Sequence, residues 1–254
     1  MPKLRYGSRR WLNQQYGRVD SDPWGLEWRP SQRERYHRMI EVLTSAAKAR
    51  PTPPRAVLDV GCATGTFTTM LRDALGGAAA DVRGIDASEV AIARARTRHP
   101  EIAFDCLSLE GAEAQLGPTF DLITMLEVLY YVPEAARATV VRRLRRLLKP
   151  GGMIVVSSMI AQRPYMSLQR LRDLLGSAFR TTDSGVLYLR PLVMLEKPLL
   201  WLMPFVERLR GGAQRSGQPK RSRMIGALSR LARETLGARA VSHGYVVAVA
   251  EGGP

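Results

Sequence analysis

One short segment constrains the fold of this chain more than any other: an apolar run that leads directly into a series of small residues. Residues 57–67 read Val-Leu-Asp-Val-Gly-Cys-Ala-Thr-Gly-Thr-Phe. The apolar start predicts a buried strand, and Gly61, Ala63 and Gly65 then fall where a helix begins. Small residues let the backbone pass close to a ligand, and the first N–H groups of a helix are free to bind one. The segment therefore predicts a strand–turn–helix unit with a ligand at the turn.

The chain around this segment alternates between strand-like and helix-like patterns. Apolar runs predict strands at 56–60, 82–85, 102–107, 120–126 and 153–158, with helices at 67–75, 88–98 and 134–148. Strands that alternate with helices of about 10–15 residues are typical of βαβ units and a parallel sheet. We therefore expect an α/β protein with a Rossmann-like, doubly wound, mostly parallel sheet.

The parts outside this core follow other patterns. Apolar residues at helical spacing cover 31–50, and Tyr245-Val-Val-Ala-Val-Ala indicates a late strand. We expect an N-terminal lid segment with a helix at 1–50 and the cofactor-binding core at 55–158. A helical insertion that covers the substrate follows at 159–239, and the final strand or strands of the core sheet at 240–254.

Composition narrows the compartment and the partners. The 254 residues carry a net charge of +15, but only five of the 38 basic residues are Lys, and a surplus of Arg can reflect genomic base composition. The two cysteines, Cys62 and Cys106, show no zinc-ligand spacing with the three histidines. No run of about 20 apolar residues is present. We expect a cytoplasmic protein without a metal, and the charge alone does not establish a nucleic-acid partner.

A carboxylate at the end of the next strand specifies the ligand further. Asp86 lies 21 positions after Gly65, where doubly wound folds bind ribose hydroxyls. The Gly-x-Ala-x-Gly turn lacks the third glycine of a dinucleotide motif, and Asp59 within the strand suits a ligand with a cationic ammonium group. These features describe S-adenosylmethionine better than NAD. An NAD-type or ligand-free Rossmann-like domain is the alternative.

The order of four motifs resembles class I S-adenosylmethionine-dependent methyltransferases over residues 55–158. The motifs are Val57-Leu-Asp-Val-Gly-Cys-Ala-Thr-Gly65, Gly84-Ile-Asp-Ala-Ser88, Phe120-Asp-Leu-Ile-Thr-Met-Leu-Glu-Val-Leu129 and Leu147-Leu-Lys-Pro-Gly-Gly-Met-Ile154. Asp22-Pro-Trp24, Arg33-Glu-Arg-Tyr36 and Glu127-Val-Leu-Tyr-Tyr131 extend the likeness: residues 1–158 resemble the nodulation protein S family of N-methyltransferases, which act on an amino group of a deacetylated chitooligosaccharide. The resemblance implies a seven-stranded sheet, S-adenosylmethionine as cofactor and S-adenosylhomocysteine as product.

The resemblance also implies roles for single residues. Asp86 would accept both ribose hydroxyls, and Leu107 and Ser108 would border the adenine. Trp24 and Arg35 would close over the cofactor, with the guanidinium on the methionyl carboxylate; from the residues alone, Trp24 fits a hydrophobic anchor equally well. The expected cofactor-binding residues are Trp24, Arg35, Asp59, Gly61, Cys62, Ala63, Gly65, Asp86, Ala87, Leu107, Ser108 and Leu126.

Three residues are the expected catalytic groups: Glu127, Tyr130 and Tyr131. They follow a strand that ends at the carboxyl edge, where open α/β sheets bind ligands. A carboxylate and aromatic faces attract an ammonium group, and Glu127 can then take its proton, although a purely structural acid is an equal alternative. We expect N-methylation of a small molecule such as an amino sugar. The alternative is O- or C-methylation of a lipid- or polyketide-like metabolite, which calls for a base such as His243, whose place the sequence does not give.

Two other partner classes follow from local sequence. Leu126-Glu-Val-Leu129 stands where methyltransferases of base amines typically have an Asn/Asp-Pro-Pro-Tyr/Phe tetrapeptide, which argues against a nucleic-acid substrate. The apolar and basic residues of 186–215 suit either a substrate lid or peripheral contact with an anionic membrane. We favour the lid.

Overall fold

The computed structural model describes residues 4–18, 22–160, 165–194, 196 and 234–251. This part of the chain forms one seven-stranded sheet in the order β3-β2-β1-β4-β5-β7-β6. The strands are β1 Ala56–Val60, β2 Asp81–Asp86, β3 Ala103–Cys106, β4 Phe120–Leu126, β5 Leu148–Met159, β6 Arg180–Leu187 and β7 His243–Val249. The helices are α1 Arg9–Tyr16, α2 Pro30–Lys48, α3 Thr66–Ala74, α4 Glu89–Arg98, α5 Leu109–Leu116, α6 Glu134–Leu147 and α7 Leu168–Gly176.

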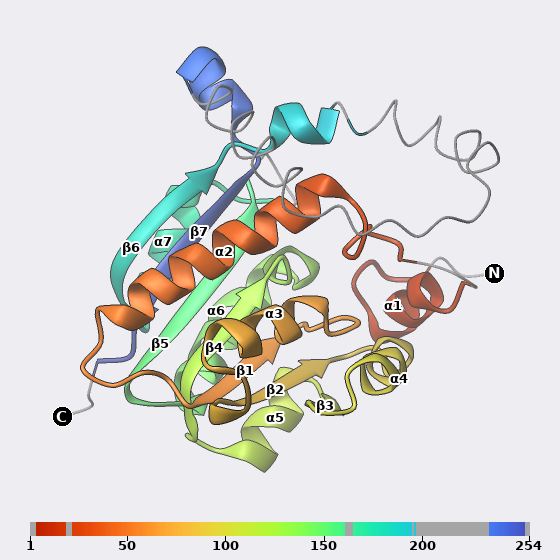
Figure 1. Cartoon of the computed structure of the whole chain (residues 1–254), viewed down its shortest axis with the longest axis vertical. Coiled ribbons are helices and arrows are strands. Elements are labelled where there is room, and N and C mark those ends of the chain that lie inside the picture. Colours follow the sequence, from red (N-terminus) through yellow and green to blue (C-terminus); the bar gives the residue numbers. More distant parts are fainter. Residues whose placement is uncertain (1–3, 19–21, 161–164, 195, 197–233, 252–254) are drawn as a thin grey trace.

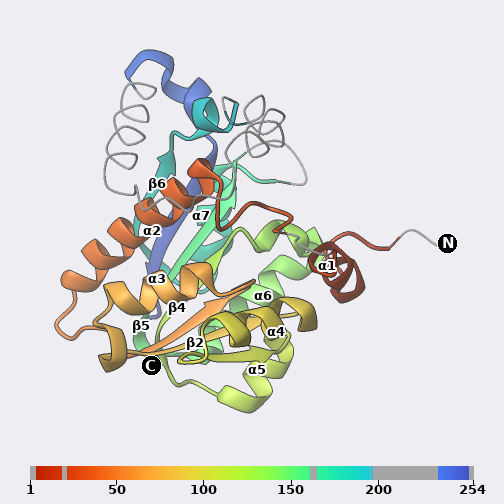
Figure 2. The same ribbon diagram turned by 45° about the vertical axis from the view of Figure 1, so that its right-hand side comes forward.

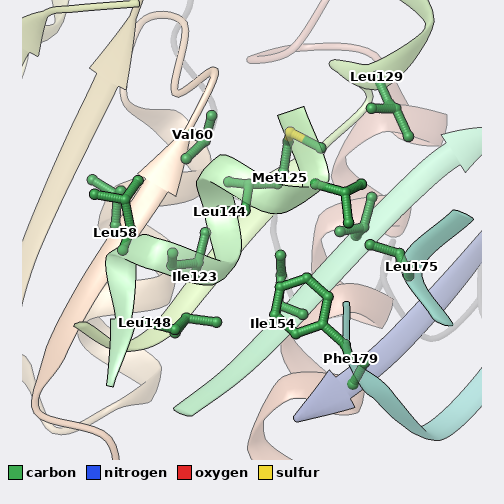
Figure 3. Packing of buried hydrophobic residues seen from close by; sticks show 14 of the residues in the cluster. Leu58, Val60, Ile123, Met125, Leu129, Leu144, Leu148, Ile154, Leu175 and Phe179 are labelled. Atoms are coloured by element: carbon green, nitrogen blue, oxygen red, sulfur yellow. The ribbon is translucent and has the colours of Figure 1, made fainter. Parts of the chain in front are cut away.

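Helices cover both faces of the sheet (Figures 1 and 2). Successive side chains of a strand point to opposite faces, and the two cores divide the strand residues in this way. Val57 of β1 packs with buried residues of α2 and α3, whereas its neighbour Leu58 belongs to the core under α6 and α7. Figure 3 shows Leu58 and Ile123 from the strands with Leu144 of α6 in that second core.

The direction of the strands confirms the expected Rossmann-like, mostly parallel, seven-stranded fold. Strands β1 to β5 pair in parallel, and β7 lies antiparallel between β5 and β6. The strand order runs outward in both directions from the β1–β4 pair. In open α/β sheets, ligands bind at the carboxyl ends of the strands at such a switch point.

The prediction of a helical insertion at 159–239 is wrong in one part. Within it, α7 is helical, but Arg180–Leu187 is the edge strand β6 and pairs with β7. The start of β6, Arg-Thr-Thr-Asp, has no apolar alternation because most of this edge strand is exposed or half-buried. Of the proposed lid or membrane segment 186–215, the structure describes 186–194 and 196, so that prediction lies mostly outside the described residues.

Candidate active site

A cavity of about 470 Å³ lies at the carboxyl edge, beside the switch point. Its walls come from the residues that follow β1, β2, β3 and β4, from the N-terminal segment and from α2. The predicted site residues that line it are Trp24, Arg35, Gly61, Ala63, Asp86, Ala87, Leu107, Ser108, Leu126, Glu127, Tyr130 and Tyr131. The structure therefore brings most of the predicted cofactor-binding and catalytic residues around one space.

The turn after β1 is compact for steric reasons. Gly61 has φ +76, and a Cβ atom there would lie 2.2 Å from Cγ2 of Val128. Ala63 also has a positive φ, 52°, which is uncommon for a residue with a side chain. The N–H groups of Gly61 and Cys62 donate to the carbonyl of Ile85 on β2, at 2.8 and 3.0 Å. Glycine is thus required where this turn meets the cavity.

Asp86 ends β2 and presents its carboxylate at the cavity wall. Its Oδ1 accepts from the N–H of Ser88 at 2.8 Å, and its Oδ2 accepts from the N–H of Ala63 at 3.1 Å. Burial raises the pKa of Asp86, and the backbone donors oppose this shift. Each carboxylate oxygen keeps further lone pairs, so the carboxylate can accept two adjacent hydroxyls of a ribose.

Three predicted cofactor-binding residues do not line the cavity: Asp59, Cys62 and Gly65. The Asp59 oxygens accept from the hydroxyls of Thr68 and Thr124, at 2.7 Å each. Cys62 packs in a core below α4, and Gly65 is the N-cap residue of α3. The Asp59 carboxylate thus binds the protein's own hydroxyls outside the cavity lining, and its contact with an ammonium group stays a prediction.

Glu127 lines the same cavity in a strained backbone conformation. It follows β4 with φ +62, and non-glycine residues in this region often mark functional sites. Its Oε1 accepts from the Ser157 hydroxyl at 2.8 Å and lies 3.6 Å from Nη1 of Arg35. Among the described residues, neither Glu127 Oε2 nor Arg35 Nη1 has a hydrogen-bond partner, although both are buried. The site thus holds a polar pair with capacity for a ligand.

His243 is one of the cavity-lining residues that the predicted site omitted. It is the first residue of β7, is 6% exposed, and places Nε2 3.8 Å from Glu127 Oε2. Its Nδ1 lies 2.8 Å from the hydroxyl of Ser242. Burial lowers the pKa of His243, and Glu127 opposes this shift. Its position in the sequence is the signal that could have indicated it. An antiparallel strand begins at the edge where its parallel neighbours end, so the first residue of such a strand lies near the ligand site.

Aromatic side chains close one side of the cavity. The Trp24 ring lies 4.9 Å from Tyr16 and 6.4 Å, edge-on, from Tyr131, and Tyr131 lies 4.6 Å from Tyr130. Burial raises the pKa of both Tyr130 and Tyr131, so both phenols are neutral. A second cavity, of about 450 Å³, shares Tyr130 and Tyr131 as its wall and has Arg5 and Arg170 on its lining.

The described ranges offer neither a metal-binding cluster nor a membrane-spanning helix. These ranges contain no group of three or more His, Cys, Asp or Glu residues placed to hold a metal ion. None of the helices described there combines the length and apolar character needed to cross a membrane.

Residues 57–152 match the methyltransferase domain family. Ubiquinone biosynthesis O-methyltransferase of Thiobacillus denitrificans is 37% identical over 113 residues, which cover 43% of this chain and 46% of that protein. The match thus spans less than half the length of this curated relative.

Solved structures show the fold over a longer stretch. N-methyltransferase NodS of Bradyrhizobium japonicum WM9, in complex with S-adenosylhomocysteine, has a TM-score of 0.61 at 19% identity and covers 95% of this chain and 97% of its own. Magnesium protoporphyrin IX methyltransferase of Synechocystis PCC 6803, with bound S-adenosylmethionine, has a TM-score of 0.57 at 17% identity and covers 99% and 100%. Residues 57–152 thus match a methyltransferase domain, and the described fold is similar to that of NodS.

Proposed function

We propose that this protein is an S-adenosylmethionine-dependent methyltransferase that acts on a hydroxyl group of a small molecule. One observation carries the proposal: a single cavity joins the ribose-type acid Asp86 to the buried polar group formed by Glu127, Arg35 and His243. The bound cofactor supplies an activated methyl group on a positively charged sulfur. The protein supplies binding, orientation and exclusion of water.

We call the part of the cavity beside Asp86 the cofactor end, and its residues fit this role. Asp86 offers a carboxylate for the ribose diol, and Gly61 and Ala63 let the backbone approach the ligand. Leu107 and Ser108 line the same cavity after β3, where an adenine would border them. Arg35 lines the same cavity, and its Nη1 has no hydrogen-bond partner among the described residues, so it is available for a ligand carboxylate.

We call the part of the cavity beside Glu127 the acceptor end. Its charge favours a neutral hydroxyl as the methyl acceptor. Arg35 lies 3.6 Å from Glu127, and their side chains are 3% and 11% exposed, so the guanidinium offsets the carboxylate charge at short range. This pairing weakens the attraction that Glu127 would exert on a cationic acceptor. The curated relative reported above is named as an O-methyltransferase, which supports the same choice.

N-methylation is the second candidate, and the amine acceptor expected from the sequence stays a prediction. The observation in its favour is the buried Glu127 Oε2, which lacks a donor among the described residues and lies in a cavity that Trp24 and Tyr131 also line. An N–H group can fill this vacancy, and aromatic faces stabilise cations. The likeness to NodS supports this candidate.

Product analysis with isotope-labelled cofactor separates the two. The purified protein is incubated with matched sets of phenols, alcohols and primary amines, and the labelled products are identified by mass spectrometry. We expect transfer to hydroxyl acceptors and little or none to amines. Turnover of amines alone would overturn the hydroxyl assignment, and no transfer to any class, together with no binding of S-adenosylhomocysteine by calorimetry, would overturn the proposed function. The proposal includes a small-molecule substrate and a cytoplasmic location.

A further inference from the structure

We propose that His243 is the catalytic base of the acceptor end, that it takes the acceptor proton on Nε2, and that Ser242 fixes it in the required tautomer. The inference rests on the proposed function and deepens it, because it assigns the proton transfer to a residue outside the predicted catalytic set.

Hydrogen bonds around Ser242 support one of the two neutral tautomers of His243. The Ser242 hydroxyl accepts from the N–H of Leu189 at 3.3 Å and donates to the carbonyl of Leu187 at 3.2 Å. A hydroxyl has one hydrogen, and the proposal assigns it to the carbonyl of Leu187, so that the imidazole is the donor in the 2.8 Å contact between His243 Nδ1 and the Ser242 oxygen. In this assignment Nδ1 carries the hydrogen, and Nε2 keeps a free lone pair.

That lone pair faces a second unused acceptor. Nε2 of His243 lies 3.8 Å from Oε2 of Glu127, beyond hydrogen-bond distance, and Oε2 has no partner among the described residues. Two buried acceptors side by side call for a donor, because a buried polar atom without a hydrogen bond is destabilising. An acceptor O–H beside them has one hydrogen to donate, and the proposal directs it to Nε2 of the imidazole.

The charges around His243 favour proton uptake during the reaction. Burial keeps the imidazole neutral beforehand by lowering its pKa, and Arg35 acts in the same direction. Once the proton arrives, the carboxylate of Glu127 lies beside the new imidazolium and stabilises it. The acceptor O–H bond breaks, its proton moves to Nε2, and the oxygen uses the remaining electron pair to bond the methyl carbon, while the pair of the broken carbon–sulfur bond stays on the sulfur of the cofactor.

The kinetic test compares His243→Gln with His37→Gln, which changes an exposed histidine of α2. General base catalysis contributes about 10²–10⁴-fold, so we expect His243→Gln to lower kcat by at least 100-fold at nearly unchanged KM and S-adenosylhomocysteine affinity. The wild-type rate should fall on acidification as His243 becomes protonated, and this limb should disappear in the variant. His37→Gln should behave as wild type.

Nitrogen-15 NMR of the cofactor-free protein tests the tautomer without turnover. The chain has three histidines, and His243→Gln identifies the signals of His243 by their loss. We expect a neutral Nδ1–H imidazole in wild type and a shift towards the Nε2–H form in Ser242→Ala. An Nε2–H imidazole in wild type, or full hydroxyl methylation by His243→Gln, would overturn this inference while the proposed function stands. If wild type methylates no acceptor and binds no S-adenosylhomocysteine, the proposed function itself fails.

Discussion

Asp59 provides a sharp test of whether a motif acid is structural or binds the ligand. Its carboxylate is 3% exposed and bonded to Thr68 and Thr124. Burial raises the pKa of Asp59 from 3.8 to about 6, although the two hydroxyl hydrogen bonds lower it. We therefore expect Asp59→Asn to stabilise the protein at neutral pH, because the amide can accept from one hydroxyl and donate to the other without a buried charge.

The sign and size of the effect follow from linkage. Because the folded-state pKa lies above the unfolded value, the folded protein binds more protons between about pH 4 and 6, and its stability falls as the pH rises through this window. A shift of about two units corresponds to about 3 kcal/mol. Asp59→Asn should match wild type near pH 4 and exceed it by about 3 kcal/mol at pH 7, or roughly 6–12 °C in Tm.

Thermal unfolding from pH 4 to 8 measures this difference, and calorimetric titration with S-adenosylhomocysteine should show an unchanged affinity. Asp121→Asn is the control of opposite sign. Burial raises the pKa of Asp121, but hydrogen bonds from Ala56 and Lys149 outweigh it and lower the pKa, so its contribution is present at neutral pH and lost on acidification. An Asp59→Asn protein that is less stable at pH 7, or that loses tenfold in affinity, would refute the structural role.

Two further predictions concern the cofactor end. Gly61→Ala should lower stability and S-adenosylhomocysteine affinity, because its Cβ would lie 2.2 Å from Val128. In the control Gly77→Ala, φ is also positive, at 61°, but no atom lies within 4 Å of the added Cβ, so only backbone strain should lower the stability. Equal losses of stability in both variants would contradict the steric argument. Asp86→Ala should weaken S-adenosylhomocysteine binding by at least about 100-fold, since two hydrogen bonds to a charged group contribute about 1.5–3 kcal/mol each. Calorimetry showing unchanged affinity would remove Asp86 from the ribose site.

The cofactor end could be predicted because its parts are local. Gly61 and Asp86 each stand directly after a predicted strand, and neighbouring parallel strands end at one edge, so their proximity follows from the pattern alone. Asp59 does not line the cavity, and the sequence held the signal for this. Side chains alternate along a strand, so Asp59 shares the face of Val57, which packs under α2 and α3. Thr68 of α3 therefore reaches it before any ligand in the cavity does.

The missed elements lack the patterns on which the prediction depended. Helix α1 contains Arg-Arg-Trp-Leu-Asn-Gln-Gln-Tyr, of which only Tyr16 is buried, so its apolar spacing is too sparse to indicate a helix. Its start has a local cap, the Ser8 hydroxyl, which accepts from the N–H of Trp11. Strand β6 is similarly polar and gains its place by pairing with β7. Such elements are stabilised by tertiary contacts that a local pattern does not contain.

The acceptor end depends on one strand, β5, that carries none of its reacting groups. Glu127 holds an unfavourable left-handed backbone, and Ser157 of β5 stabilises it twice, by accepting its N–H at 3.0 Å and by donating its hydroxyl to Oε1 at 2.8 Å. Two residues further along β5, Met159 pairs with His243. The antiparallel direction of β7 is what brings a histidine 116 positions after Glu127 to the same edge. The pairing of carboxylate and imidazole is thus a property of strand order and register, which is why the residue pattern alone located Glu127 and left His243 without a place.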